Sequence, residues 1–324
     1  MADSTRRPIA AAVAGAACIA SSAVVMRLAG SSASTAALCR CAFALPVLGV
    51  LAIAERRRGA PLLAARSRWL ARLSGVFLAG DLILWSHSIS AIGAGLATVV
   101  TNLQVLIVAL LAWWILGERP RRSLLLASPV MFAGLTLVAG LAGAHAYGTR
   151  PGIGVILGVA VAILYTIFIL MLRHATVAPG PGGTPGAVAG PLFESTLGAA
   201  ATSLVIGYML HDFRLGHAWP ALGWLVLLAL TSQVLGWMLI TVSMPRLPAW
   251  LVSALLLVQP AGSVALSAMA LGERPSPEQL LGVALILAGV LIAASGRTRP
   301  AQPGAAGREG VPQDAGEPAV RSSA

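Results

Sequence analysis

The sequence has little charge and no lysine. Only 10% of its 324 residues are charged, whereas 57% are apolar. An average soluble protein has about 25% charged residues. A soluble domain of this length cannot hide so much apolar surface, and the apolar runs of roughly 20 residues have the length that crosses a bilayer. The composition therefore predicts an integral membrane protein.

All 22 basic residues are arginine, and the formal net charge is +11. The arginines stand in short clusters between apolar runs, where cytoplasmic loops of membrane proteins carry positive charge. This placement argues against a nucleic-acid partner. The absence of lysine, together with heavy use of alanine and glycine, indicates a GC-rich bacterial genome.

Cysteines and catalytic motifs are also scarce. Cys18, Cys39 and Cys41 lie inside apolar segments and fit neither a disulfide framework nor a zinc site. The sequence has no Walker motif, HExxH, CxxC or Ser/His/Asp constellation with usable spacing. We therefore expect no enzyme activity, no catalytic residue, no metal site, no cofactor and no ATP-driven transport.

Ten apolar runs predict an all-α integral membrane fold with ten transmembrane helices. They are residues 8–29, 33–53, 69–90, 96–116, 123–141, 152–172, 189–210, 219–241, 249–271 and 277–295. The first run follows Arg6 and Arg7 and imitates a signal peptide, but more apolar runs follow at once. This pattern favours an uncleaved first helix.

Loop arginines orient the ten helices. With a cytoplasmic N-terminus, fifteen loop arginines lie on the cytoplasmic side and three on the other. The positive-inside rule thus predicts a multi-pass protein of the bacterial inner membrane with both termini in the cytoplasm. Residues 176–186 are rich in proline and glycine and predict a flexible loop, and residues 296–324 predict a disordered cytoplasmic tail.

An internal repeat divides the chain. The sequence LGERP at 116–120 recurs at 271–275, and in that register residues 96–134 match residues 251–289 at 12 of 39 positions. The repeats, at 8–141 and 151–295, hold five predicted helices each, so they must cross the membrane in opposite directions. Inverted repeats are typical of transporters that alternate between outward-open and inward-open states.

These features resemble the drug/metabolite transporter superfamily, specifically its EamA-like group of two five-helix repeats. The resemblance rests on both LGERP sequences, the following Ala-Gly pairs, Arg40, and Gln259-Pro260. The chain departs from the family where Gln104-Val105 replaces a proline that the fourth helix often carries. The resemblance implies an exporter of amino acids or other small metabolites, although some members of the family are importers or drug-efflux pumps.

The glutamates of the two LGERP sequences, Glu118 and Glu273, are predicted to be structural. A glutamate just before a new helix stabilises the positive end of that helix dipole. Proline is tolerated at a helix start.

Polar side chains at mid-membrane depth are the candidate substrate-binding residues, because such groups are costly in a bilayer. Asp81, Trp85 and Ser88 share one helix face, which suits an amino or cationic group or a proton. The structural alternative is an ion pair between Asp81 and Arg40. His87 lies on another face and is expected to be interfacial.

Further candidates come from three other helices. Gln104 and Gln259 occupy equivalent positions of the two repeats, with Asn102 beside the first, and either line a cavity or bond between helices. Gln233 and Trp237 share a face of the eighth helix, with Tyr165 in the sixth and Glu194 in the seventh as weaker candidates. Arg40 either neutralises a substrate carboxylate or extends towards the membrane surface.

The sequence therefore predicts a secondary active transporter, an exporter of amino acids or related amphipathic compounds that works by alternating access. Its partners are a small-molecule substrate and the lipid bilayer, with the proton as a candidate coupling ion at Asp81. Alternatives are multidrug efflux, a lipid or nucleotide-sugar carrier, and a non-transporting membrane scaffold. The sequence predicts neither the substrate nor the oligomeric state.

Overall fold

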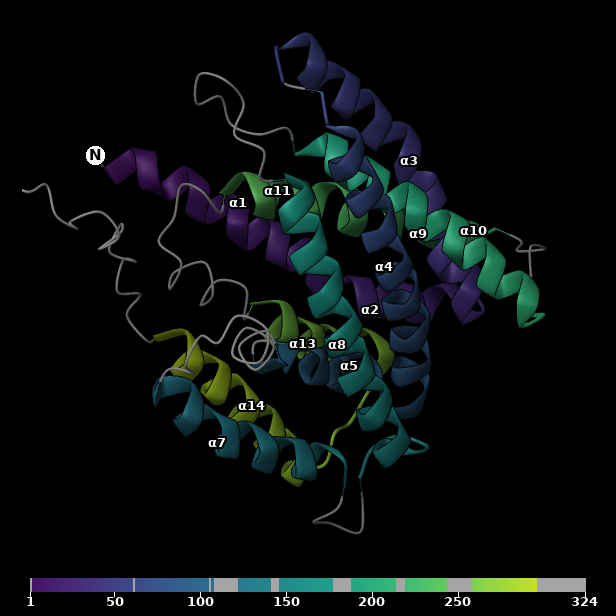
Figure 1. Cartoon of the computed structure of the whole chain (residues 1–324). Helices are drawn as coiled ribbons and strands as arrows, with labels where there is room; N and C mark the ends of the chain where they lie inside the picture. Colours follow the sequence, from purple (N-terminus) through teal and green to yellow (C-terminus); the bar gives the residue numbers. More distant parts are fainter. Residues whose placement is uncertain are drawn as a thin grey trace, which may run out of the picture.

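The computed structural model describes most of the chain, and every regular element in the described segments is a helix (Figure 1). The segments are residues 2–60, 62–104, 106–107, 122–140, 146–176, 188–213, 219–243 and 258–295. The first LGERP sequence, residues 177–186 of the predicted loop and the predicted tail lie outside them.

The first repeat contains six described helices. They are α1 (Ala2–Ala20), α2 (Ser22–Ala29), α3 (Ala33–Arg57), α4 (Ala65–Ile92), α5 (Ala94–Thr101) and α7 (Arg122–Val138). Gly30 ends α2 in the left-handed conformation, with a φ of 59°, which glycine adopts without strain.

The second repeat shows the same order of helices. They are α8 (Pro151–Thr176), α9 (Ala189–Met209), α10 (Ala221–Leu228), the π-helix η1 (Ala229–Gly236), α11 (Trp237–Ser243), α13 (Val258–Leu271) and α14 (Pro277–Ser295). Together α10, η1 and α11 form one continuous helical span at the eighth predicted position.

Helices occur at all ten predicted positions, although the fourth and ninth are described only in part. Among the described residues, six helices are long and apolar enough to cross a membrane. Three shorter apolar helices occupy Leu125–Val138, Val258–Leu271 and Pro277–Ala293. The described part of the chain thus confirms an all-helical membrane fold without deciding the number of spans.

Apolar side chains cover the outside of the bundle, and charged ones occur inside it. Ile156 and Met269 are 69% and 83% exposed, whereas Arg40 and Asp81 are 5% and 6% exposed. Water would favour the reverse arrangement, because large exposed apolar surfaces are rare on soluble proteins. The distribution is that of a protein surrounded by hydrocarbon.

The two repeats pack against each other through several pairs of described helices. Equivalent helices meet in the pairs α3–α9, α5–α13 and α7–α14, of which α7 and α14 lie side by side in Figure 1. The contact of α4 with α8 has its counterpart in the contacts of α1 and α2 with α10, η1 and α11. The repeat found in the sequence is therefore also a repeat of helix contacts.

Glycines allow the α7–α14 pair to approach closely. A Cβ on Gly282 would lie 2.6 Å from the backbone oxygen of Gly134, and a Cβ on Gly134 would lie 2.6 Å from that of Gly282. Gly289, which the repeat aligns with Gly134, faces Met131 at the same crossing. The repeated Ala-Gly pair thus lies at a close helix crossing.

Glu273 caps a helix of the other repeat. Its carboxylate accepts hydrogen bonds from the backbone N–H groups of Ala94, at 2.7 Å, and Gly95, at 3.2 Å. Gly93 has a φ of 90°, and a Cβ there would lie 2.8 Å from the Glu273 Oε2 atom. The glutamate is structural, as predicted, but it stabilises the start of α5.

The helix that follows Glu273 is capped by other residues. Ser276 Oγ accepts from the Gln279 N–H at 3.3 Å, and Gln279 Oε1 accepts from the Ser276 N–H at 3.1 Å. This reciprocal pair is a capping box. The prediction that Glu273 serves its own following helix is therefore wrong, because that helix start is already satisfied.

We expect Gly282→Ala to destabilise the protein by about 1–3 kcal/mol, since the added methyl group forces α7 and α14 apart. The measurement is the thermal unfolding of purified protein in detergent. Gly152→Ala is the matched control, because nothing lies within 4 Å of a Cβ at this helical glycine. Equal stability of the two variants would contradict the close crossing.

Candidate functional site

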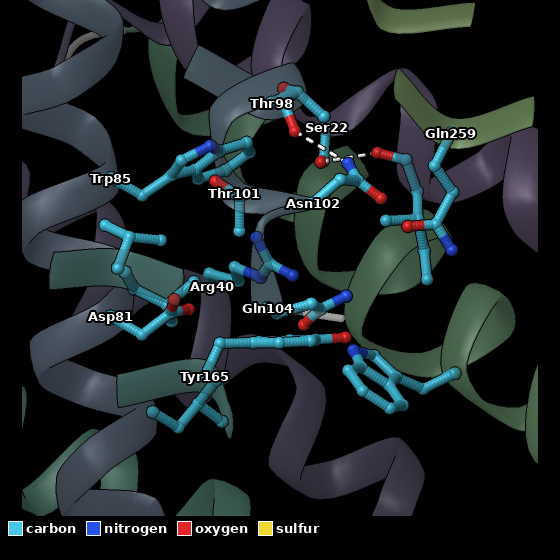
Figure 2. A pocket seen from close by; sticks show the side chains of 15 residues that line it. Ser22, Arg40, Asp81, Trp85, Thr98, Thr101, Asn102, Gln104, Tyr165 and Gln259 are labelled. Atoms are coloured by element: carbon cyan, nitrogen blue, oxygen red, sulfur yellow. Dashed lines mark hydrogen bonds between the residues drawn. The ribbon is translucent and has the colours of Figure 1, made fainter. Parts of the chain in front are cut away.

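A cavity of about 80 Å³ lies inside the bundle, where helices of both repeats meet. This volume is enough for several water molecules. Figure 2 shows the side chains that surround it. The lining residues are Ile19, Ser22, Arg40, Leu78, Asp81, Leu82, Trp85, Thr98, Thr101, Asn102, Gln104, Val161, Tyr165, Trp237 and Gln259.

Seven of the eight predicted site residues line this cavity. They are Arg40, Asp81, Trp85, Asn102, Gln104, Trp237 and Gln259. The eighth, Gln233, is fully buried and does not line it. The structure therefore brings together side chains that lie on several helices and are widely separated in the sequence.

Arg40 and Asp81 give the cavity two opposite charges. Both side chains are more than nine-tenths buried, and they do not form a direct ion pair with each other. Asp81 Oδ1 has no hydrogen-bond partner among the described residues. The structure therefore does not show the ion pair between Asp81 and Arg40, although both residues line the cavity.

Ser232 and Gln233 accept hydrogen bonds from the Arg40 guanidinium group. The Arg40 Nε–H donates to Gln233 Oε1 at 3.0 Å, and Arg40 Nη2 donates to Ser232 Oγ at 3.1 Å. Gln233 Nε2 in turn donates to Thr196 Oγ1 at 3.3 Å. These bonds offset the cost of burying the guanidinium group and fix its orientation.

Polar side chains on and just after α5 form one wall. Asn102 Nδ2 donates to the Thr98 backbone oxygen at 2.8 Å, and Thr101 Oγ1 donates to the Ala97 oxygen at 3.0 Å. Gln104 has no hydrogen bond to the described part of the chain. Its amide is therefore free to bond with a solute.

Gln259, at the start of α13, is the repeat counterpart of Gln104 and lines the same cavity. Its amide likewise makes no hydrogen bond to a described residue. The two amides approach one space from the two repeats, as Figure 2 shows. Buried amides normally find partners inside the protein, so this pair is suited to contact a ligand.

Aromatic rings form the opposite wall. Tyr165 lies 6.1 Å from Trp237 between ring centroids, and both rings pack on Phe168 at 5.8 and 5.7 Å. Trp85 lines the cavity from α4. Rings of this kind accommodate an apolar group and attract a cation through their faces.

The remaining sequence candidates lie elsewhere. Glu194 is buried and pairs with Arg72, with 2.6 Å between Glu194 Oε2 and Arg72 Nε, and does not line the cavity. His87 is exposed, and Ser88 donates to the Gly154 backbone oxygen at 2.8 Å. Among the described residues, no group of histidine, cysteine, aspartate or glutamate side chains could hold a metal ion.

Ser22 and Thr98 also line the cavity and were not predicted from the sequence. Thr98 could have been found, because it lies at i, i+3 and i+4 spacing with Thr101 and Asn102 and so shares their helix face. Ser22 carries no such signal. It is the first residue of α2.

The fold and cavity define the class as a polytopic helical membrane protein with a polar site enclosed by two repeats. The sequence profile of the EamA-like transporter family matches the chain twice, at residues 6–140 and 152–295. The chain therefore belongs to the EamA-like transporter family and is a membrane transporter of small molecules. The resemblance to the drug/metabolite transporter superfamily is confirmed.

Comparison with solved structures agrees with the fold. A structure described only as "Crystal structure of protein" is similar to this chain with a TM-score of 0.58 at 18% identity. The alignment covers 90% of this chain and 98% of that one. No curated protein matches the sequence.

We expect a cysteine placed in the cavity to react with a small water-soluble thiol reagent. In protein whose Cys18, Cys39 and Cys41 are replaced by alanine, Thr101→Cys should react at least about tenfold faster than Ser203→Cys, because thiol reactivity follows access and ionisation. Ser203 is fully buried away from the cavity. The rates are measured with a methanethiosulfonate reagent, and equal rates would contradict a water-accessible cavity.

Proposed function

We propose that this protein is a secondary active transporter that exports amino acids or related amphipathic metabolites. The observation that carries the proposal is the cavity with buried Arg40 and Asp81, which are not paired with each other. Opposite charges held apart in a low-dielectric site complement the carboxylate and ammonium groups of one zwitterion. The aromatic wall suits the apolar part of the same molecule.

Alternating access around this cavity is the proposed mechanism. The two repeats would run in opposite directions through the bacterial inner membrane as ten spans, with both termini in the cytoplasm. Pairing of equivalent helices across the repeat interface supports this arrangement. Exchange of conformations between the two repeats would open the cavity to each side in turn.

Multidrug efflux is the second candidate function. A carboxylate with an unpartnered oxygen beside Trp85, Tyr165 and Trp237 also suits a lipophilic cation. Resistance of cells to a cationic fluorescent dye separates the candidates, because Arg40 repels a cation that lacks a carboxylate. Dye export without amino-acid export would favour this second function.

The decisive experiment is metabolite profiling of medium and cytoplasm in cells that overexpress the protein. We expect one amino acid or related compound to accumulate outside with the wild type and not with Gln104→Ala/Gln259→Ala. The double variant removes the amides that both repeats present to the cavity. Metabolites are quantified at matched membrane levels of the two proteins.

Thr136→Ala is the control for this experiment. Its hydroxyl is exposed on α7 and donates only to the Ala133 backbone oxygen of its own helix, so the variant should export as the wild type does. Export by the double glutamine variant at the wild-type level would remove the cavity from the transport pathway. Absence of export by the wild type would count against the exporter function.

We also expect Asp81→Asn to abolish transport driven by a pH gradient, because an amide of nearly the same shape cannot bind and release the coupling proton. The measurement is substrate flux into proteoliposomes with and without an imposed gradient. An elution profile unchanged in size-exclusion chromatography shows that the variant is folded. A gradient response equal to that of the wild type would exclude Asp81 as the coupling residue.

A further inference from the structure

The π-helical segment η1 presents two consecutive side chains to the same buried group. Ser232 and Gln233 are both fully buried, and both accept hydrogen bonds from Arg40. Both acceptors lie in a π-helical segment inside a longer helical span, and such segments often mark functional sites.

Three helical elements fix the Arg40 side chain. Arg40 itself lies on α3, its two acceptors lie on η1, and Gln233 is held in place by Thr196 of α9. These bonds occupy Nε and Nη2. Nη1 has no hydrogen-bond partner in the described part of the chain, and the side chain lines the cavity.

We infer that Ser232 and Gln233 are positioning residues, which hold Arg40 so that its remaining amino group binds the carboxylate of the transported molecule. The inference rests on the proposed function and deepens it, because it makes a carboxylate the feature for which the cavity selects. Asp81 lines the same cavity, and in the proposal its carboxylate binds the ammonium group of the same molecule.

The chemistry of arginine explains why this position needs it. The guanidinium group has five N–H donors in a planar fork, so it can be held by two acceptors and still offer donors to a ligand. A lysine ammonium is a single charged point on a flexible stem. With two of its three donors bound by acceptors, an ammonium would keep only one for a carboxylate, whereas the guanidinium keeps three.

Equilibrium binding to the purified full-length protein in detergent tests the inference. The two probes are L-leucine and L-leucinamide, which share an ammonium group and side chain but differ in the carboxylate. We expect the wild type to prefer L-leucine by at least about tenfold, the effect of one hydrogen bond to a charged group. Isothermal titration calorimetry gives both dissociation constants.

Gln233→Ala should remove most of this preference by weakening L-leucine alone, and Ser232→Ala should reduce it less. Thr231→Ala is the matched control, because its hydroxyl belongs to the same π segment but donates to the Leu227 backbone oxygen at 2.7 Å. Equal weakening of both probes by Gln233→Ala would mean a structural role and would overturn the inference, as would an unchanged preference.

Gln233→Glu keeps the test decisive if the alanine variant fails to fold. The carboxylate is nearly isosteric with the amide and still accepts from Arg40, but it neutralises the guanidinium charge. We expect the affinity for L-leucine to fall at least as far as in Gln233→Ala, with the affinity for L-leucinamide retained. A wild-type preference in Gln233→Glu would contradict the inference.

A second measurement separates failure of the inference from failure of the proposed function. If the wild type binds neither probe, the proposed substrate class is wrong. The NMR resonances of the arginine Nε–H groups then still test the hydrogen bond from Arg40 to Gln233. The Arg40 signal is assigned by its loss in Arg40→Lys. It should shift in Gln233→Ala and stay in place in Thr231→Ala, and an unchanged signal in Gln233→Ala would overturn the positioning role.

Discussion

The hydrogen bonds from Arg40 to Ser232 and Gln233 hold a charge inside a bundle whose outer surface is apolar. A buried charge without partners is expensive, so its neighbours must supply hydrogen bonds from within the protein. Those acceptors come from the opposite repeat, 192 and 193 residues further along the chain. The same bonds that offset the cost of burying Arg40 thus also join the two repeats.

Elsewhere too, polar groups buried between the repeats find hydrogen-bond partners within the protein. Glu273 of the second repeat supplies the acceptors for the first amides of α5 in the first repeat. Thr98 and Thr101 of the cavity wall lie on α5, and Asn102 directly follows it. Reciprocal glycines let α7 and α14 approach closely. The site is therefore positioned by contacts at the repeat interface.

Much of the fold and most of the site could be predicted from the sequence. Bilayer-length apolar runs located the helices, and the cost of polar groups in hydrocarbon selected Asp81, Gln104 and Gln259, all of which line the cavity. Gln233 satisfied the same rule but lies behind Arg40. Polarity at depth shows that a side chain needs a partner, and it does not show whether that partner is protein or solute.

The membrane environment, the two repeats and the set of polar side chains that must turn inward follow from composition, apolar periodicity and the internal repeat, which the sequence carries alone. Which of these side chains meet depends on how the helices pack. The packing set Arg40 apart from Asp81 and gave Arg40 two partners on a π-helical segment. Such pairings depend on helix packing across the repeats, and local sequence carries no record of it.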